Sequence, residues 1–194
     1  WDRGTEQFAA GSLLAADYLG IPNVELPLQR LRRLRKDEED GIRAAFARRM
    51  AHEPIQYVFG TAYFRSLKLK VGPGCLIPRP ETELLAGFVI ESAPRGGTVC
   101  ELGAGSGALG LSIALERPDL RVFASELSPE AFKWADLNRL ELCASNFELR
   151  SGDLFAPFEG MRFDAVVANL PYIPSGDMAT LQPEVRLCEP SMAL

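Results

Sequence analysis

The chain has 194 residues, of which 47% are hydrophobic, 9% aromatic and 24% charged. This composition is typical of a globular protein with a buried core and excludes disordered, collagenous and coiled-coil classes. The formal net charge of -5 argues against a large nucleic-acid interface, which requires a clustered cationic face. No apolar run approaches the roughly 20 residues that cross a bilayer, so we expect a cytoplasmic protein without membrane contact.

The chain contains few histidine and cysteine residues, which often act in catalysis or bind metal ions. His52 is the only histidine, which removes the usual base of a catalytic triad. The 4 cysteines lie far apart and form no CxxC pair. We therefore predict no metal site and expect the cysteines to be buried, reduced thiols.

The first part of the chain carries helical signals. An apolar stripe through residues 8–18 predicts one helix, a second is expected around residues 28–34, and a third begins with Asp37 as its N-cap. The basic cluster at residues 30–36 is interpreted as a solvated helix face, with a docking patch for an acidic partner or RNA as the alternative. Residues 1–54 are therefore predicted to form a small helical domain.

A period-two pattern follows from Tyr63 to Ile77, with the turn residues Gly72-Pro73-Gly74 inside it. This pattern predicts a β-hairpin, and we assign residues 55–78 to a linker between domains. A helix is then expected from Pro80 onward. Its predicted apolar face consists of Leu84, Leu85, Phe88 and Val89.

The remainder of the chain alternates between strand-like and helix-like segments. Such alternation predicts a parallel sheet with helices on its faces, so the fold class is α/β, with residues 79–194 forming a Rossmann-like domain. The predicted strands are 98–102, 121–125, 147–150 and 163–168, and the predicted helices are 108–116 and 129–142.

A glycine-rich turn follows the first of these strands. In the run Glu101-Leu102-Gly103-Ala104-Gly105-Ser106-Gly107, the glycines let the backbone turn tightly and approach a ligand. Glu126 ends the next strand, where a carboxylate can accept the ribose hydroxyls of an adenosine. Asp153 and Leu154 close the third strand, where an acid can hold the adenine amino group and a leucine can cover the ring. A dinucleotide and S-adenosylmethionine both remain open at this point, and so does a plain tight turn.

The fourth strand runs directly into Asn169-Leu170-Pro171-Tyr172. Asn169 thus stands at the carboxyl end of a buried strand, where open α/β sheets bind their ligands. The tetrapeptide is similar to the Asn-Pro-Pro-Tyr signature of methyltransferases that modify a planar amino group. The segments 52–60 and 76–83 specifically resemble the HemK-type (PrmC-like) family of release factor protein-(glutamine-N5) methyltransferases, which have the class I methyltransferase fold.

The resemblance implies S-adenosylmethionine-dependent N5-methylation of the glutamine in the GGQ motif of peptide-chain release factors, which the helical domain would recognise. It implies that the acceptor amide binds at the tetrapeptide Asn169, Leu170, Pro171 and Tyr172. Together with the residue-level reasoning it gives the donor site as Glu101, Gly103, Ala104, Gly105, Ser106, Gly107, Glu126, Asp153, Leu154 and Asn169. Arg79, Pro80 and Glu81 match a family segment near the pocket; Arg79 or Glu81 could equally form an ion pair between domains.

Two departures from the family pattern keep alternatives open. Leu170 replaces the first proline, and Asn-Leu-Pro-Tyr is also typical of RNA adenine N6-methyltransferases, although the acidic net charge and the segment 77–83 favour glutamine. Only four strands are predicted where class I sheets usually have seven. We therefore expect a fragment of a longer protein whose sheet is incomplete at its C-terminus, and a non-catalytic donor-binding fragment is the remaining alternative.

Overall fold

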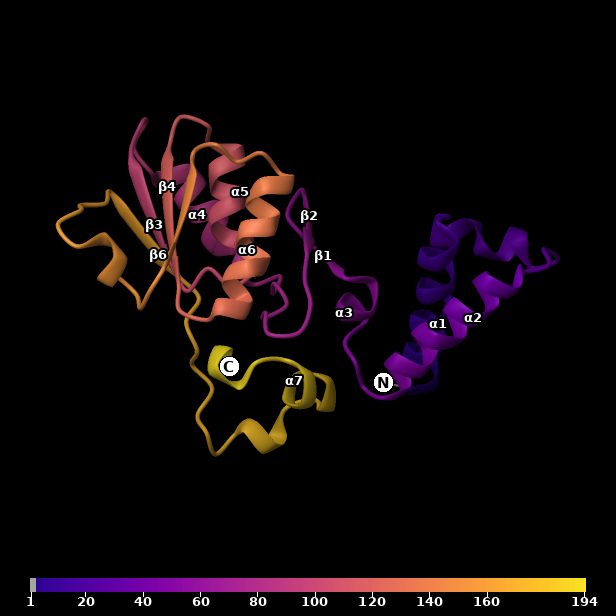
Figure 1. The fold of residues 1–194 in the computed structure, drawn as a ribbon. Coiled ribbons are helices and arrows are strands. Elements are labelled where there is room, and N and C mark those ends of the chain that lie inside the picture. The colour runs from indigo at the N-terminus through magenta and orange to yellow at the C-terminus, as the bar shows by residue number, and fades with distance from the viewer. Residues whose placement is uncertain (1–2) are drawn as a thin grey trace.

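A helical part and an α/β part are joined by a hairpin (Figure 1) in the computed structural model, which describes residues 3–194 and the side chains from residue 11 onward. Helices α1 (Arg3–Leu19) and α2 (Lys36–Met50) lie side by side, with a 3₁₀ helix at Asn23–Gln29 between them. The first predicted helix is confirmed, while the side chain of Phe8 lies outside the described ones. Among the described residues, no helix is both long and apolar enough to span a bilayer.

The second and third predicted helices need correction. Residues 30–35 are not helical, and Leu28 and Leu31 are 80% and 88% exposed, so no packing surface rewards a helix there. Helix α2 has Arg35 rather than Asp37 as its N-cap, and the Arg35 backbone N–H donates to the Glu38 carboxylate. Asp37 instead lies in the first turn, where acidic side chains favour the helix dipole.

The predicted linker, residues 55–78, contains the short helix α3 (Ile55–Phe59) and the antiparallel strands β1 (Thr61–Phe64) and β2 (Leu67–Lys70). The hairpin is confirmed, but its turn is at Arg65-Ser66 and not at the glycines 72–74. The Arg65 side chain forms an ion pair with Glu116 at 2.6 Å, which holds this turn against the α/β part. Gly72 serves close packing, since a Cβ there would lie 2.5 Å from the Trp134 ring.

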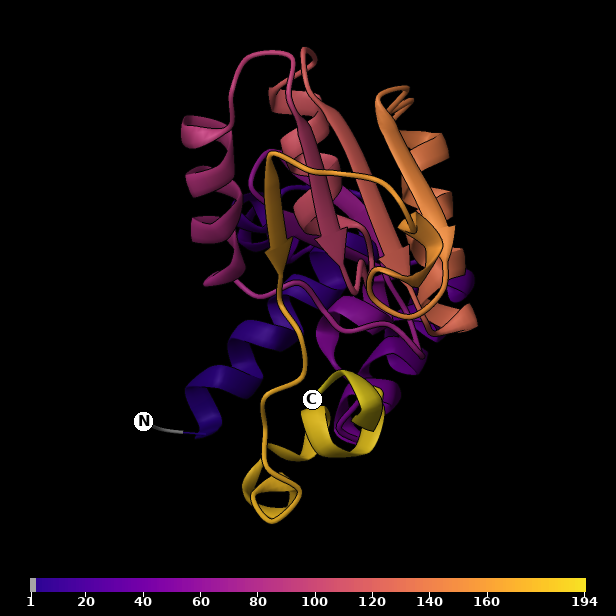
Figure 2. The same cartoon turned by 90° about the vertical axis from the view of Figure 1, so that its left-hand side faces the viewer.

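Four parallel strands form the main sheet in the order β5-β4-β3-β6, as predicted for an α/β fold. Their bounds are β3 Thr98–Leu102, β4 Arg121–Glu126, β5 Phe147–Ser151 and β6 Ala165–Ala168. Helices α4 (Thr82–Ser92), α5 (Ala108–Glu116) and α6 (Pro129–Glu141) lie on one side of the sheet; in Figure 2, α5 and α6 are behind the strands and α4 is to the left of β6. Because all four strands point the same way, their carboxyl ends meet at one edge.

Two apolar clusters hold the sheet. The larger lies between the sheet and the three helices and includes the fully buried Val99, Leu111, Ile113 and Ala124. On the other face, Phe158 and Phe163 pack edge-on against each other with ring centroids 5.6 Å apart, next to Phe123 of β4. The sheet is thus buried on both faces near β4, as expected for parallel strands.

The predicted burial of all cysteines is wrong, and so is most of the predicted apolar face of α4. Val89 of that face is buried as predicted, but Leu84 and Phe88 are 75% and 77% exposed. The helix packs through Val89 and Ala86, whose small side chains allow close approach to α5. Cys75 and Cys100 are buried, Cys188 is half-buried, and Cys143 is exposed. Cys143 follows the end of α6 with a φ of +54°, in a turn at the surface.

The segment after β6 returns beneath the carboxyl edge of the sheet (Figure 1). It holds a 3₁₀ turn at Met178–Thr180, helix α7 (Pro183–Cys188) and a 3₁₀ turn at Ser191–Ala193. Arg49 of α2 forms an ion pair with Glu184 of α7 at 2.6 Å. This segment therefore links the helical part to the edge where the strands end.

Replacing Leu111 by alanine is expected to lower the free energy of unfolding by roughly 2–5 kcal/mol, because Leu111 is fully buried between α5 and the sheet. Leu115→Ala, one turn along the same helix and 36% exposed, is the matched control and should cost less than about 1 kcal/mol. Urea unfolding measures both. Equal losses would contradict the assignment of this helix face to the core.

Candidate active site

The glycine loop, residues 103–107, connects β3 to α5 at the carboxyl edge of the sheet. Gly103, Gly105 and Gly107 have φ values of +73°, +58° and +79°, which residues with a Cβ rarely adopt. The N–H groups of Gly103 and Ala104 both donate to the carbonyl of Ser125, at 3.0 and 2.9 Å. The loop is thereby fixed against the end of β4.

Glu126, at the end of β4, bonds to two neighbouring loops. Its Oε2 accepts the N–H of Gly105 and its Oε1 accepts the N–H of Ser128, each at 2.7 Å. The Gly107 N–H is also engaged, since it donates to the Ala104 carbonyl at 2.7 Å. The amides of residues 103, 104, 105 and 107 thus all have protein acceptors, and a phosphate, which binds through free backbone N–H groups, finds none at these four positions.

Glu101 is a buried carboxyl group beneath the same loop. It is 2% exposed and its Oε2 accepts the N–H of Gly110 at 3.0 Å. Burial raises the pKa of Glu101 to about 8, the charge of Glu126 adds to this, and the bond from Gly110 opposes it. Near neutral pH this side chain therefore holds a proton.

A small cavity of about 50 Å³ opens beside the loop. It brings together most of the predicted donor residues, namely Glu101, Gly103, Ala104, Gly105, Ser106 and Asn169. The remaining predicted donor residues, Gly107, Glu126, Asp153 and Leu154, do not line it. Asp153 and Leu154 are exposed at the end of β5. Leu76, Pro78 and Thr82 of the family segment 76–83 also line it, whereas the contribution of Phe64 was missed from the sequence.

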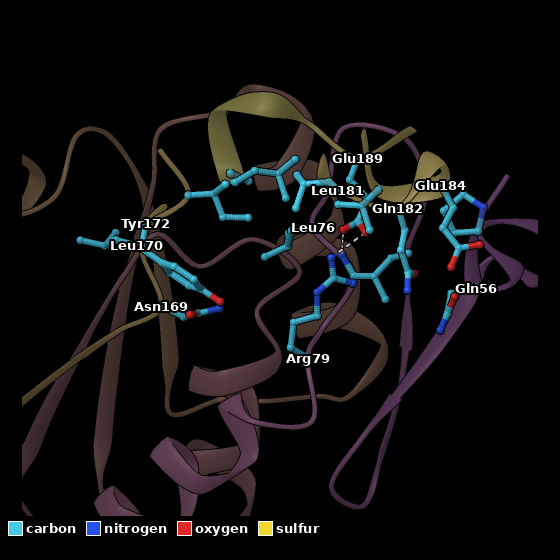
Figure 3. A pocket seen from close by; sticks show the side chains of 16 residues that line it. Gln56, Leu76, Arg79, Asn169, Leu170, Tyr172, Leu181, Gln182, Glu184 and Glu189 are labelled. Atoms are coloured by element: carbon cyan, nitrogen blue, oxygen red, sulfur yellow. Dashed lines mark hydrogen bonds and ion pairs between the residues drawn. The ribbon is translucent and has the colours of Figure 1, made fainter. Parts of the chain in front are cut away.

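A larger cavity of about 390 Å³ lies next to it, beneath the segment after β6. Asn169, Leu170 and Tyr172 line one side of it, and Figure 3 shows Gln182, the residue before α7, Glu184 of α7 and Gln56 of α3 on the other. Pro171 does not line it. Leu76, Arg79 and Asn169 line both cavities, so the two hollows adjoin at these residues.

Arg79 crosses the larger cavity to reach Glu189 (Figure 3). Its Nη2 donates to Glu189 Oε1 at 2.7 Å, and the Ile77 N–H donates to Glu189 Oε2 at 3.0 Å. The Glu189 side chain is 1% exposed and that of Arg79 is 33% exposed. Arg79 thus forms an ion pair within the predicted domain 79–194 rather than between domains, and it also lines both cavities, while Pro80 and Glu81 are exposed and line neither cavity.

Glu189 was missed from the sequence because no local spacing connects it to Arg79, 110 residues earlier. His52 lies exposed in the turn after α2, where its carbonyl accepts a bond from the Cys188 thiol at 3.6 Å. Within the described part of the chain, no group of three or more histidine, cysteine, aspartate or glutamate residues is placed to hold a metal ion.

Comparison with known proteins finds two family matches. Residues 80–184 match the methyltransferase small domain, and residues 2–60 match the PrmC N-terminal domain. The release factor glutamine methyltransferase of Geobacter sulfurreducens is 36% identical over 100% of this chain and 70% of its own length. That of Streptomyces coelicolor is 43% identical over 76% of this chain and 54% of its own length. That of Chlorobaculum tepidum is 34% identical over 95% of this chain and 67% of its own length.

The chain thus spans between about half and 70% of the length of these relatives. Among solved structures, Trm5b from Pyrococcus abyssi matches with a TM-score of 0.49 and 22% identity, covering 58% of this chain and 33% of that one. A ribosomal protein L11 methylase from Lactobacillus delbrueckii matches with a TM-score of 0.45 and 28% identity, covering 53% and 52%.

The raised pKa of Glu101 predicts that stability falls as the pH rises. The unfolded chain loses this proton near the ordinary value of 4.5, whereas the folded chain keeps it up to about 8. Between these values the free energy of unfolding should fall with pH by up to roughly 1 kcal/mol per pH unit from this group. Glu101→Gln keeps an acceptor for Gly110 and should flatten that slope in urea unfolding at several pH values. Parallel pH profiles for the two proteins would contradict the buried, protonated state.

The Arg79–Glu189 pair should show energetic coupling. Arg79→Met keeps the aliphatic stem, and Glu189→Gln keeps an acceptor for the Ile77 N–H. Each is expected to lower the free energy of unfolding by about 1–3 kcal/mol, because each leaves a partly or fully buried charge without its partner. The double variant should cost less than the sum of the two by about 1 kcal/mol or more. Additive losses in urea unfolding would mean that the two side chains do not interact in solution.

Proposed function

We propose, on the premise that the chain belongs to the release factor glutamine methyltransferase family, that it methylates N5 of the glutamine in the GGQ motif of a peptide-chain release factor. The matches confirm the predicted family, its α/β methyltransferase fold and its cofactor, S-adenosylmethionine. The observation that carries the proposal is the position of Asn169, at the end of β6 and in the wall of both cavities.

The small cavity and the loop around it suit the methyl donor. S-adenosylmethionine supplies an electrophilic methyl group on a positively charged sulfur and carries no phosphate. The engaged amides of the loop leave no phosphate site at those positions, and the carboxylate of Glu126 favours a cation over a dinucleotide, whereas Glu101, protonated near neutral pH, adds no charge. Each Glu126 oxygen still has a lone pair for a ribose hydroxyl, beyond the backbone N–H that it already accepts.

A donor of nucleoside size needs more room than the small cavity, whose volume of about 50 Å³ corresponds to one or two water molecules. The exposed side of the glycine loop offers that room, because Gly103 faces outward there. Asp153 and Leu154 are exposed at the end of β5, and we propose that they contact the adenine. We therefore propose that the donor lies along the carboxyl edge of β3, β4 and β5.

The tetrapeptide after β6 suits the acceptor amide. An amide nitrogen is a poor nucleophile because its lone pair is delocalised into the carbonyl group, so alignment matters more than a base. The Asn169 side-chain oxygen and the Leu170 carbonyl can accept the two amide N–H bonds, and Tyr172 can stack on the planar group. Holding both reactants in this way can contribute roughly 7–11 kcal/mol. No histidine is needed, in keeping with the exposed position of His52.

The end of the tetrapeptide is held by the returning segment. The N–H groups of Tyr172 and Ile173 donate to the Leu194 carbonyl, at 3.1 and 2.8 Å. Pro171, between the two accepting groups and the ring, limits the backbone to one φ value. These restraints support a preorganised acceptor site rather than a flexible loop.

For the domains, we propose that residues 1–54 recognise the release factor, that residues 55–78 are the linker, and that residues 79–194 carry out methyl transfer. The match of residues 2–60 to the PrmC N-terminal domain supports a separate helical domain at this end. Because the partner would be a component of translation, we propose that the protein works in the cytoplasm.

The proposed function is tested by incubating the chain with S-adenosylmethionine labelled in its methyl group and with a release factor. A release factor in which the GGQ glutamine is replaced by alanine is the control substrate. Label is expected on the parent release factor and absent from the alanine variant. Label on RNA instead would favour adenine N6-methylation, and binding of S-adenosylhomocysteine without any labelled product would favour a non-catalytic donor-binding module.

Asn169→Ala is expected to lower kcat by about 10² or more, because it removes an acceptor that acts mainly on the aligned, reacting amide. Labelled-methyl transfer to the release factor measures kcat and KM. The matched control is Asn146→Ala, since Asn146 lies at the opposite edge of the sheet and its side-chain amide donates to the carbonyls of Ala114, Arg117 and Leu120, away from both cavities. Unchanged kcat in Asn169→Ala would rule out the proposed alignment.

A further inference from the structure

Asn138, on α6, is a buried polar residue outside the two cavities. It is 1% exposed and makes three hydrogen bonds. Its Oδ1 accepts the Lys70 N–H at 2.7 Å, and its Nδ2 donates to the carbonyls of Lys70 and Ser106, each at 2.9 Å. A single side chain thus joins the end of β2 to the glycine loop, which lie 36 positions apart in the sequence.

The two bonds to Lys70 imitate strand pairing. A side-chain amide offers a carbonyl and an N–H in the arrangement that a neighbouring strand would present, so Asn138 satisfies both backbone groups at the end of β2. The third bond then uses the second amide hydrogen on Ser106. Because the side chain is fixed by Lys70, the carbonyl of Ser106 has one favoured position.

Trp134, four positions earlier, lies on the same face of α6. Its Nε1 donates to the Pro73 carbonyl at 3.2 Å, and its ring packs against Gly72, where a Cβ would lie only 2.5 Å away. Helix α6 therefore holds the linker along residues 70–73 and, through Asn138, the glycine loop as well.

We infer that Asn138 is a positioning residue for methyl transfer: it sets the glycine loop through the Ser106 carbonyl and ties that loop to the linker. The inference concerns the proposed donor site and so rests on the proposed function. Asn138 touches neither cavity, and it acts through Ser106, which lines the smaller one. Donor affinity should therefore depend on a side chain that has no contact with the donor.

Asn146 is the control that distinguishes a purely structural role from positioning of the glycine loop. Its Nδ2 also donates to backbone carbonyls, those of Ala114, Arg117 and Leu120, at 2.9, 3.4 and 3.0 Å. Asn138→Ala and Asn146→Ala each remove such a cluster, so both should lower the urea midpoint. Only Asn138→Ala should weaken the binding of S-adenosylhomocysteine, by tenfold or more in calorimetric titration of the folded protein. Equal affinity in Asn138→Ala and the parent would overturn the inference.

In Asn138→Asp, the pH dependence of the affinity for S-adenosylhomocysteine gives a measurement that a loss of stability alone would not change. The carboxylate keeps the acceptor for the Lys70 N–H but turns an oxygen toward the carbonyls of Lys70 and Ser106, which repel it. Affinity for S-adenosylhomocysteine should be weak above neutral pH and recover at least threefold on acidification, because the protonated acid can donate one bond again. A pH profile parallel to that of the parent would count against positioning through Ser106.

The inference and the proposed function can fail separately. If S-adenosylhomocysteine binds but no release factor is methylated, the proposed function fails and the Asn138 comparison still decides the inference. If the parent does not bind S-adenosylhomocysteine, amide hydrogen exchange of residues 103–107 decides it. Exchange should be at least tenfold faster in Asn138→Ala and unchanged in Asn146→Ala, and equal exchange in Asn138→Ala and the parent would overturn the inference.

Discussion

The bridge made by the Glu126 carboxylate holds the site in place. One oxygen accepts the N–H of Gly105 and the other accepts the N–H of Ser128, so one side chain is bonded both to the loop after β3 and to the residue just before α6. Ser128 in turn caps α6, since its side chain accepts the N–H of Ala131. The start of α6 and the shape of the glycine loop are therefore set together, and Asn138, further along the same helix, meets that loop again at Ser106.

This arrangement satisfies the loop amides inside the protein and leaves carboxyl groups nearby. A loop built to hold phosphate would keep its N–H groups free, whereas here four of them bond to Ser125, Glu126 and Ala104. The glycines are needed for the positive φ values that bring those amides to their acceptors. Because these loop N–H groups already bond to protein acceptors, the loop suits a cation without phosphate better than a dinucleotide. The spacing of the glycines alone does not separate these two ligands.

The sequence predicts the parallel sheet, the glycine loop and the position of Asn169 because each depends on a local pattern and on parallel strands ending at a common edge. It does not predict the Arg79–Glu189 pair, which joins segments 110 positions apart. It places the hairpin turn at the glycines 72–74, yet Gly72 packs against the Trp134 ring and Gly74 against the Glu130 side chain, which are tertiary contacts. Of the face that it assigns to α4, Val89 is buried but Leu84 and Phe88 are exposed, because that helix is apolar on several sides and only its packing against α5 selects one.

The structure explains how a leucine can stand in place of the first proline of the tetrapeptide. Leu170 Cδ2 lies 3.1 Å from where a Cβ on Gly103 would be, so the leucine side chain packs against the glycine loop. Proline would fix φ at this position, and the leucine replaces that restraint with a contact to the loop. The residue that carries the proposed acceptor carbonyl, Leu170, is thus in contact with the proposed donor loop at Gly103. This contact, together with Asn169 in the wall of both cavities, links the proposed donor and acceptor sites, and such a link would keep the two reactants in the alignment that the reaction requires.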